Sequence, residues 1–263
     1  MAGEPTLTYD ELLTQLAVTQ PRVAKALTAA HDNRRRNLAA YASGARLAGL
    51  NELLIHLDLV RQSLADHGLD YKVGFLLNRA AADFETAVEA ALAGYVGVAH
   101  DAMRDIMEIE FLLRDFAAAP DYLDRWLTSS DAERRTFFSA NQLRQRHAGR
   151  LGVTVEKLPE HTDYKGHSVV LHVTPARTPF HAKGLSSSEV PFGVDMAFWD
   201  IFQHAHRLLF TIHDLLLTEQ FAAVENPDPH DMLPLVRSGF ERTQEMQAIF
   251  LALLNAAQAA GDA

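Results

Sequence analysis

The sequence predicts an all-α protein, an irregular multi-helix bundle with a small non-helical insertion around residues 152–192. Three observations lead to this fold class. Long stretches repeat apolar residues at the helical period of about 3.6. Helix caps and glycine stops separate these stretches. Within 152–192 the period disappears, and prolines and glycines interrupt the chain. Nothing marks an internal boundary, so we expect a single helical domain over residues 1–263.

The first helices are defined by their end signals. Thr8 and Glu11 have the spacing of a capping box, which predicts a short helix through Val18. A proline then opens a helical stretch over residues 21–67, where two glycines are candidate break points. Gly68 directly follows this stretch and is a typical helix stop.

Residues 91–116 organise the sequence, and we expect them to form one long helix within the helical stretch 70–118, with Gly94 and Gly97 as candidate bend points. Most of its apolar residues fall on one arc at 100° per residue. Glu110 projects into that arc, where an unpaired carboxylate would cost several kcal/mol. Two interpretations remain open. Glu110 is either an acid, base or metal ligand, or a carboxylate paired with an arginine from a facing helix.

The second half of the chain contains the most basic stretch. Ser130 and Glu133 form a second capping-box pattern, and the helix that they open is expected to run to about residue 150 and carries five arginines. Residues 168–174 give the only strand signal. Helix resumes over residues 194–224, and a last helix follows a proline-rich turn.

Composition excludes several classes of protein. The absence of cysteine rules out disulfides and thiolate metal sites. No apolar run approaches the roughly 18 residues of a membrane span, and the N-terminus lacks a signal-peptide core. We therefore expect a cytoplasmic protein with no membrane partner. The formal net charge of −10 argues against a non-specific polyanion binder with a broad basic face.

Histidines and one aspartate are prominent in the stretch 194–224. His206 and His213 are two helical turns apart, about 10.5 Å along the axis, which is too far to share one metal ion. Each could act singly or be a satisfied core histidine. His204 follows Asp200 by four residues, the spacing of a simple helix pair.

The insertion holds four further histidines, whose spacings match no structural zinc pattern. We therefore expect no metal and no other cofactor. These four are His161, His167, His172 and His181.

One combination of motifs resembles a known group of proteins. The helix segment MRDIMEIEFLLRDF is followed by a proline and a tryptophan segment, and a tyrosine–serine–histidine run lies downstream. Together they resemble an uncharacterised bacterial all-helical family with a central Arg-x-x-x-Glu helix. That family is in turn similar to the HEPN (higher eukaryotes and prokaryotes nucleotide-binding) domains, many of them ribonucleases in defence and toxin systems. The resemblance implies binding roles for Arg104, Glu108, Tyr164, Ser168 and His172.

The resemblance also suggests catalytic residues, because HEPN nucleases carry Arg-x(4–6)-His on a helix. Arg207 and His213 have this spacing, as do Arg61 and His67. In such a pair, arginine would stabilise the charge of the scissile phosphate while histidine moved the 2′-hydroxyl proton. The family usually has a polar residue after the arginine, and here Leu208 follows Arg207.

Three functional hypotheses follow. The leading one is an HEPN-like helical protein of defence or stress type that cleaves RNA, with Arg207, His213 and Glu110 as its catalytic residues. The alternative is a small-molecule or metal-binding protein with an internal pocket around Glu110, His206 and His213. The third is a non-enzymatic interaction module that forms a homodimer or larger homo-oligomer.

Overall fold

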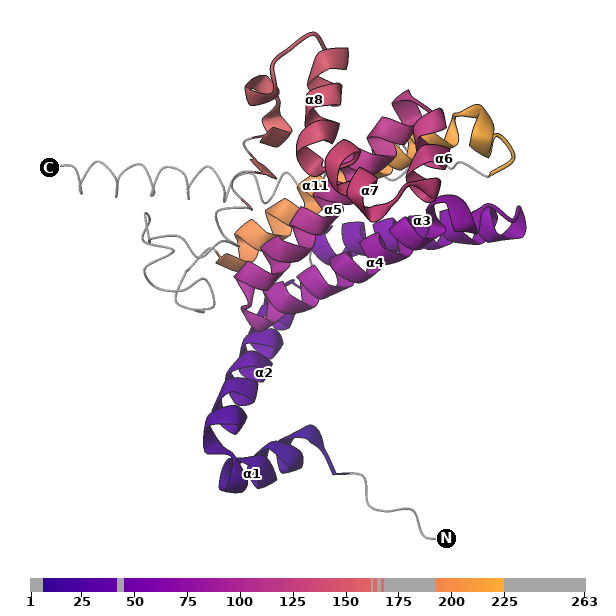
Figure 1. Ribbon diagram of the computed structural model, residues 1–263. Coiled ribbons are helices and arrows are strands. Elements are labelled where there is room, and N and C mark those ends of the chain that lie inside the picture. Colours follow the sequence, from indigo (N-terminus) through magenta and orange to yellow (C-terminus); the bar gives the residue numbers. More distant parts are fainter. Residues whose placement is uncertain (1–6, 42–44, 162, 165–166, 168–192, 225–263) are drawn as a thin grey trace, which may run out of the picture.

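A computed structural model describes residues 7–41, 45–161, 163–164, 167 and 193–224. Every regular element in these residues is a helix, which confirms the all-α multi-helix bundle (Figure 1). No described helix is both long and apolar enough to cross a membrane. The elements are α1 (Tyr9–Thr19), α2 (Pro21–Tyr41), α3 (Ala45–Asp66), α4 (Asp70–Ala93), α5 (Val96–Ala118), α6 (Asp121–Thr128), α7 (Asp131–Phe137), α8 (Ala140–Arg150), η1 (Val155–Lys157), α11 (Gly193–Leu216) and η2 (Glu219–Phe221).

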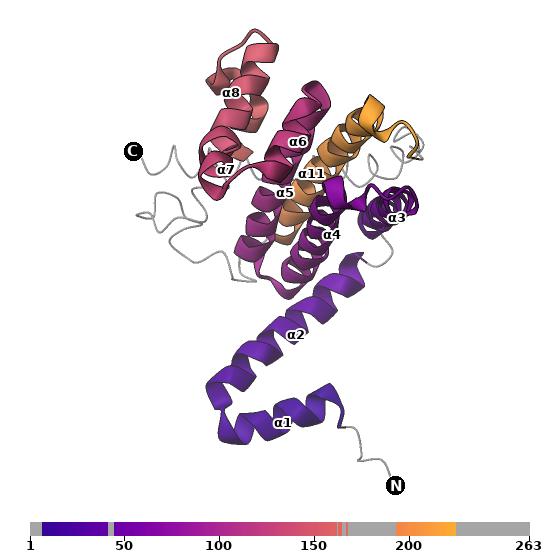
Figure 2. The same ribbon diagram turned by 45° about the vertical axis from the view of Figure 1, so that its right-hand side comes forward.

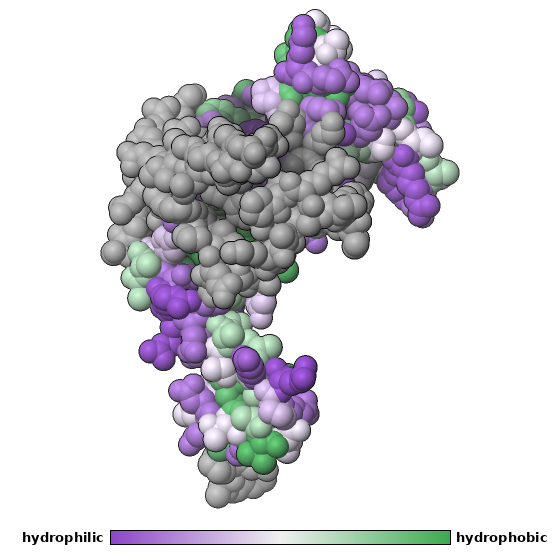
Figure 3. Space-filling model, turned by 90° about the vertical axis from the view of Figure 1, so that its left-hand side faces the viewer, coloured by the Kyte–Doolittle hydropathy of each residue, from purple (hydrophilic) through white to green (hydrophobic). Residues whose placement is uncertain are grey.

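Helices α1 and α2 form an arm that projects from the rest of the molecule (Figure 2). The capping box at its start is confirmed, because the Thr8 hydroxyl accepts from the Glu11 amide at 3.3 Å and the Glu11 carboxylate accepts from the Thr8 amide at 2.7 Å. Helix α1 buries none of its residues. On the surface of the arm, hydrophobic and hydrophilic residues lie side by side (Figure 3). The opposite end of the molecule, around α8, is mostly hydrophilic.

Residues 91–116 do not form one helix, because the chain turns back between α4 and α5 at Gly94, one of the two candidate bend points. Gly94 ends α4 in the left-handed conformation, with φ +86°, which glycine adopts without steric cost. A Cβ atom there would also lie 2.9 Å from the side-chain nitrogen of Asn33. Asn33 itself donates to the carbonyl of Ala93 at 3.2 Å and so satisfies one of the last carbonyls of α4.

Helix α5 is the centre of the core, since it packs against both α4 and α11. The apolar arc predicted for it is buried, with Met103, Ile106 and Leu113 fully inaccessible to solvent. Phe198 and Phe202 of α11 are buried against the same core. The core is one continuous cluster of side chains that extends from the end of α2 to the residues after η2.

The basic stretch predicted as one helix to about residue 150 is two helices, α7 and α8. The chain breaks at Phe138, which is buried, and Ser139, whose backbone is extended. Helix α8 is bound to α5 by Asp115, a buried carboxylate that accepts from Arg146 at 2.7 Å and from Arg150 at 2.5 Å. Asp115 thus offsets one of the two positive charges that Arg146 and Arg150 bring to this contact.

The predicted non-helical insertion around residues 152–192 is partly helical in its described residues, and residues 168–192 lie outside them. Gly152, with φ +66°, follows α8, and the 3₁₀ helix η1 comes next. Pro159 then begins a helical turn, a position that proline favours because its missing N–H needs no partner there. The described residues 163, 164 and 167 are helical as well, whereas the predicted strand 168–174 lies outside the described residues.

One acidic side chain between α4 and α5 makes the stability depend on pH. Burial and the neighbouring carboxyl of Asp105 raise the pKa of Asp83 to about 7, although Arg79 opposes the shift. A carboxyl whose pKa is raised by folding stabilises the protein below its unfolded pKa, and this contribution is lost as the pH rises through the folded pKa. The variant Asp83→Asn should therefore be more stable than the wild type at about pH 8, with a difference that shrinks towards pH 5.

Urea unfolding over this pH range measures the effect. Glu85→Gln, on the exposed surface of the same helix, is the matched control and should follow the wild type. A stability difference for Asp83→Asn that stays constant with pH would contradict the assignment.

Candidate functional site

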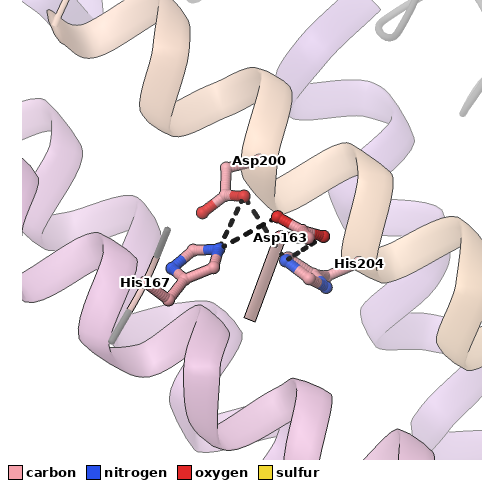
Figure 4. A group of neighbouring side chains, drawn as sticks. All are labelled: Asp163, His167, Asp200 and His204. Atoms are coloured by element: carbon pink, nitrogen blue, oxygen red, sulfur yellow. Dashed lines mark hydrogen bonds and ion pairs between the residues drawn. The ribbon is translucent and has the colours of Figure 1, made fainter. Parts of the chain in front are cut away.

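Four acidic and histidine side chains meet where α11 faces the helical segment after η1. They are Asp163, His167, Asp200 and His204, and one ligand atom of each lies within 4.8 Å of the others (Figure 4). Three of the four are buried, and Asp163 is partly buried. They form the candidate metal centre of the part of the chain that the structure describes.

The local sequence explains how the four side chains converge. Residues 163–167 and 200–204 both read Asp-x-x-x-His, and a spacing of four places two side chains on one face of a helix. Where two such faces meet, the pairs form a four-residue cluster. We predicted Asp200 and His204 as a simple helix pair, and we did not single out Asp163. The repeated pattern was the signal that could have found the cluster.

The orientation of His167 is set by a backbone group. Its Nδ1 lies 3.0 Å from the carbonyl oxygen of His100, which can only accept, so Nδ1 carries a proton. Its Nε2 faces Asp200 at 3.2 Å and Asp163 at 3.6 Å. Burial alone would lower the pKa of His167, but these carboxylates raise it overall. A histidine held in this way by a carbonyl is the usual arrangement around a protein-bound metal ion.

Asp200 is a buried carboxylate with three histidine neighbours. One oxygen accepts from His100 Nδ1 at 2.8 Å, and the other faces His167 at 3.2 Å and His204 at 3.3 Å. Burial would raise the pKa of Asp200, but His167 and His100 hold it well below its usual range. Asp200 is therefore an ionised group within the protein, and three imidazoles surround it.

Glu110 lies beside this cluster and is fully buried. Its partners are Arg114 on its own helix and Arg207 on α11, whose Nε lies 3.4 Å from Glu110 Oε2. Glu110 thus has the contact that its structural interpretation predicts, an arginine from a facing helix. Burial raises the pKa of Glu110, and both arginines oppose that shift. Arg207 in turn binds Asp163 at 2.6 Å, so Arg207 links Glu110 to the candidate metal centre.

The structure brings together three of the five residues that the family resemblance singled out. The hydroxyl of Tyr164 accepts from Arg104 at 3.1 Å and donates to Glu108 at 3.0 Å. The guanidinium of Arg144 lies over the ring of Tyr164, 4.1 Å from its centroid. Ser168 and His172 lie outside the described residues.

The predicted pocket around Glu110, His206 and His213 gains no support from the described residues. Glu110 is inside the protein, whereas His206 is exposed and lies against the ring of Phe210. His213 lies near His56 of α3, and it lowers the pKa of His56 in addition to the larger effect of burial. The histidines that surround Asp200 of the candidate metal centre are instead His100, His167 and His204.

The proposed catalytic pair Arg207 and His213 is separated around the helix. Six residues along α11 correspond to a rotation of roughly 240°. The guanidinium of Arg207 is bound to Asp163 and lies beside Glu110, whereas His213 faces the side where His56 lies.

No protein-family model, curated protein or solved structure matches the chain. The resemblance to HEPN-like proteins therefore stays a prediction.

The burial of Glu110 predicts a large effect of its removal on stability. Glu110→Ala should lower the free energy of unfolding by about 3–5 kcal/mol, because it leaves two partly buried arginines without their shared partner. Glu85→Ala is the matched control, since Glu85 lies on the exposed surface of the neighbouring helix α4. It should cost less than about 1 kcal/mol. Equal losses in chemical unfolding would contradict this account of Glu110.

Proposed function

We propose that the protein binds one divalent transition-metal ion through Asp163, His167, Asp200 and His204. The observation that supports this proposal is the convergence of four nitrogen and oxygen ligand atoms within 4.8 Å of one another. Ligands at about 2.0–2.2 Å from one ion are themselves about 3–4 Å apart. The cluster needs only a small contraction to reach that geometry.

The donor set narrows the choice of ion. Two imidazoles and two carboxylates, without thiolate, suit Zn²⁺, Fe²⁺, Mn²⁺ or Ni²⁺ rather than Cu⁺ or an iron–sulfur cluster. The two carboxylates also neutralise the two charges of such an ion, which matters because the site is mostly buried. A bound ion of this class would act as a Lewis acid, and any position left open by the protein could hold water or substrate.

The groups behind the ligands support the same proposal. His100 contributes twice, since its carbonyl accepts from His167 and its ring donates to Asp200. Such outer contacts fix the tautomer of a histidine ligand and the rotation of a carboxylate ligand. With the Nδ1 proton of His167 bound to a carbonyl, a neutral ring directs its Nε2 lone pair at two carboxylates. That arrangement is repulsive unless a proton or a cation lies between them.

RNA cleavage, the leading hypothesis from the sequence, gains no specific support from this geometry. Arg207 is bound to Asp163, and two of the arginines of α8 are bound to Asp115. These three guanidiniums are therefore already paired with carboxylates of the protein. A metal centre is therefore the function that the arrangement of side chains favours.

Metal titration of the purified, chelator-treated protein tests the proposal. Elemental analysis should find about one ion per chain after reloading, and the ion should raise the melting temperature, because it binds only the folded state. His204→Gln should weaken binding by at least about 100-fold, since it removes a ligand rather than an outer contact. His206→Gln, two residues away and exposed, is the matched control and should bind like the wild type. Equal affinities of the two variants would overturn the assignment.

A further inference from the structure

Arg207 supplies positive charge to the same side chains that the proposed metal ion would use. Its Nη2 donates to Asp163 at 2.6 Å and to Nδ1 of His204 at 2.8 Å. The side chain is 17% exposed, and the described residues around it provide a further carboxylate, Glu110. The guanidinium thus neutralises a carboxylate ligand and contacts a histidine ligand.

The contact with His204 decides which nitrogen of that ring carries the proton. An arginine N–H can only donate, so Nδ1 of His204 accepts and, in a neutral ring, Nε2 carries the proton. Nε2 is also the atom that faces Asp200 at 3.3 Å and Asp163 at 3.9 Å, and it would have to bind the ion through a lone pair. Metal binding therefore requires Nε2 to release its proton and Nδ1 to take one up, with no net change in the protonation of the ring. Arg207 must leave Nδ1 for this to happen.

Glu110 provides a second carboxylate that Arg207 can bind. Glu110 Oε2 and Arg207 Nε are both buried, and neither has a hydrogen-bond partner among the described residues. They lie 3.4 Å apart, and closing this distance to about 2.9 Å would form a charge-assisted hydrogen bond. The other oxygen of Glu110 is already held by Arg114, so the carboxylate is fixed in position to receive Arg207.

We propose that Arg207 is an exchangeable counter-ion of the metal centre, which binds Asp163 and His204 in the metal-free protein and moves onto Glu110 when the ion binds. This inference rests on the proposed metal site and adds a mechanism that sets its affinity. Arg207 competes with the ion, and Glu110 stabilises the metal-bound state by accepting the displaced guanidinium. Both act through other residues and are therefore positioning residues rather than ligands.

Zn²⁺ titrations of the full chain, monitored by calorimetry, test the exchange. Arg207→Gln removes the competitor and should tighten Zn²⁺ binding by about tenfold, the scale of outer-shell effects on metal affinity. Glu110→Gln keeps the shape of the side chain but weakens the accepting site, so it should weaken binding by a similar factor. In the double variant the effect of Glu110→Gln should vanish, because no guanidinium is left to accept. Arg79→Gln, which removes an equal charge from an exposed ion pair, is the matched control and should leave affinity unchanged.

A second measurement does not depend on how well Glu110→Gln folds. Nitrogen NMR of the His204 ring should show the Nε2–H tautomer in the metal-free wild type and the Nδ1–H tautomer after Zn²⁺ is added. Unchanged affinity in Arg207→Gln, or an Nδ1–H tautomer already present without metal, would overturn the exchange while leaving the metal site in place. A wild-type protein that binds no Zn²⁺, Mn²⁺, Fe²⁺ or Ni²⁺ would instead overturn the metal site itself.

Discussion

Asp200 keeps a negative charge inside the protein, and three parts of the chain must hold their positions for it to do so. Helix α11 carries the carboxylate, the start of α5 provides His100, and the segment after η1 provides His167. A buried charge without such partners would cost several kcal/mol, so these contacts constrain how α5 and α11 can pack. Met103 and Phe198 lie in the buried apolar core that the same two helices share.

Features that depend on neighbouring residues could be predicted from the sequence. The capping box at Thr8 and the apolar arc of α5 are present as expected, because both follow from helical spacing alone. The sequence marks Gly94 as a candidate bend, but periodicity does not separate a bent helix from two helices joined by a turn. Helices α4 and α5 face the same core, so their apolar patterns continue across the turn. Its left-handed backbone is a local property, but the close approach of Asn33 is a tertiary one.

The candidate site was harder to predict, because its pattern is common. A spacing of four residues between acid and histidine places the two side chains on one face of a helix, and it does not indicate which pairs face one another across helices. Asp200 and His204 were visible as a pair, but their relation to His167 depends on the packing of α11. Glu110 shows the opposite case, since one apolar arc was enough to identify it as anomalous. Its partner on α11 had to come from the structure.

The double use of His100 has a consequence for how this site tolerates sequence change. Its ring can be lost by a single substitution, but its carbonyl belongs to the backbone and remains whatever side chain is present. The orientation of His167 is therefore protected against point mutation at residue 100, whereas the position of Asp200 is not. The first turns of α5 thus give the cluster a component that substitution alone cannot remove.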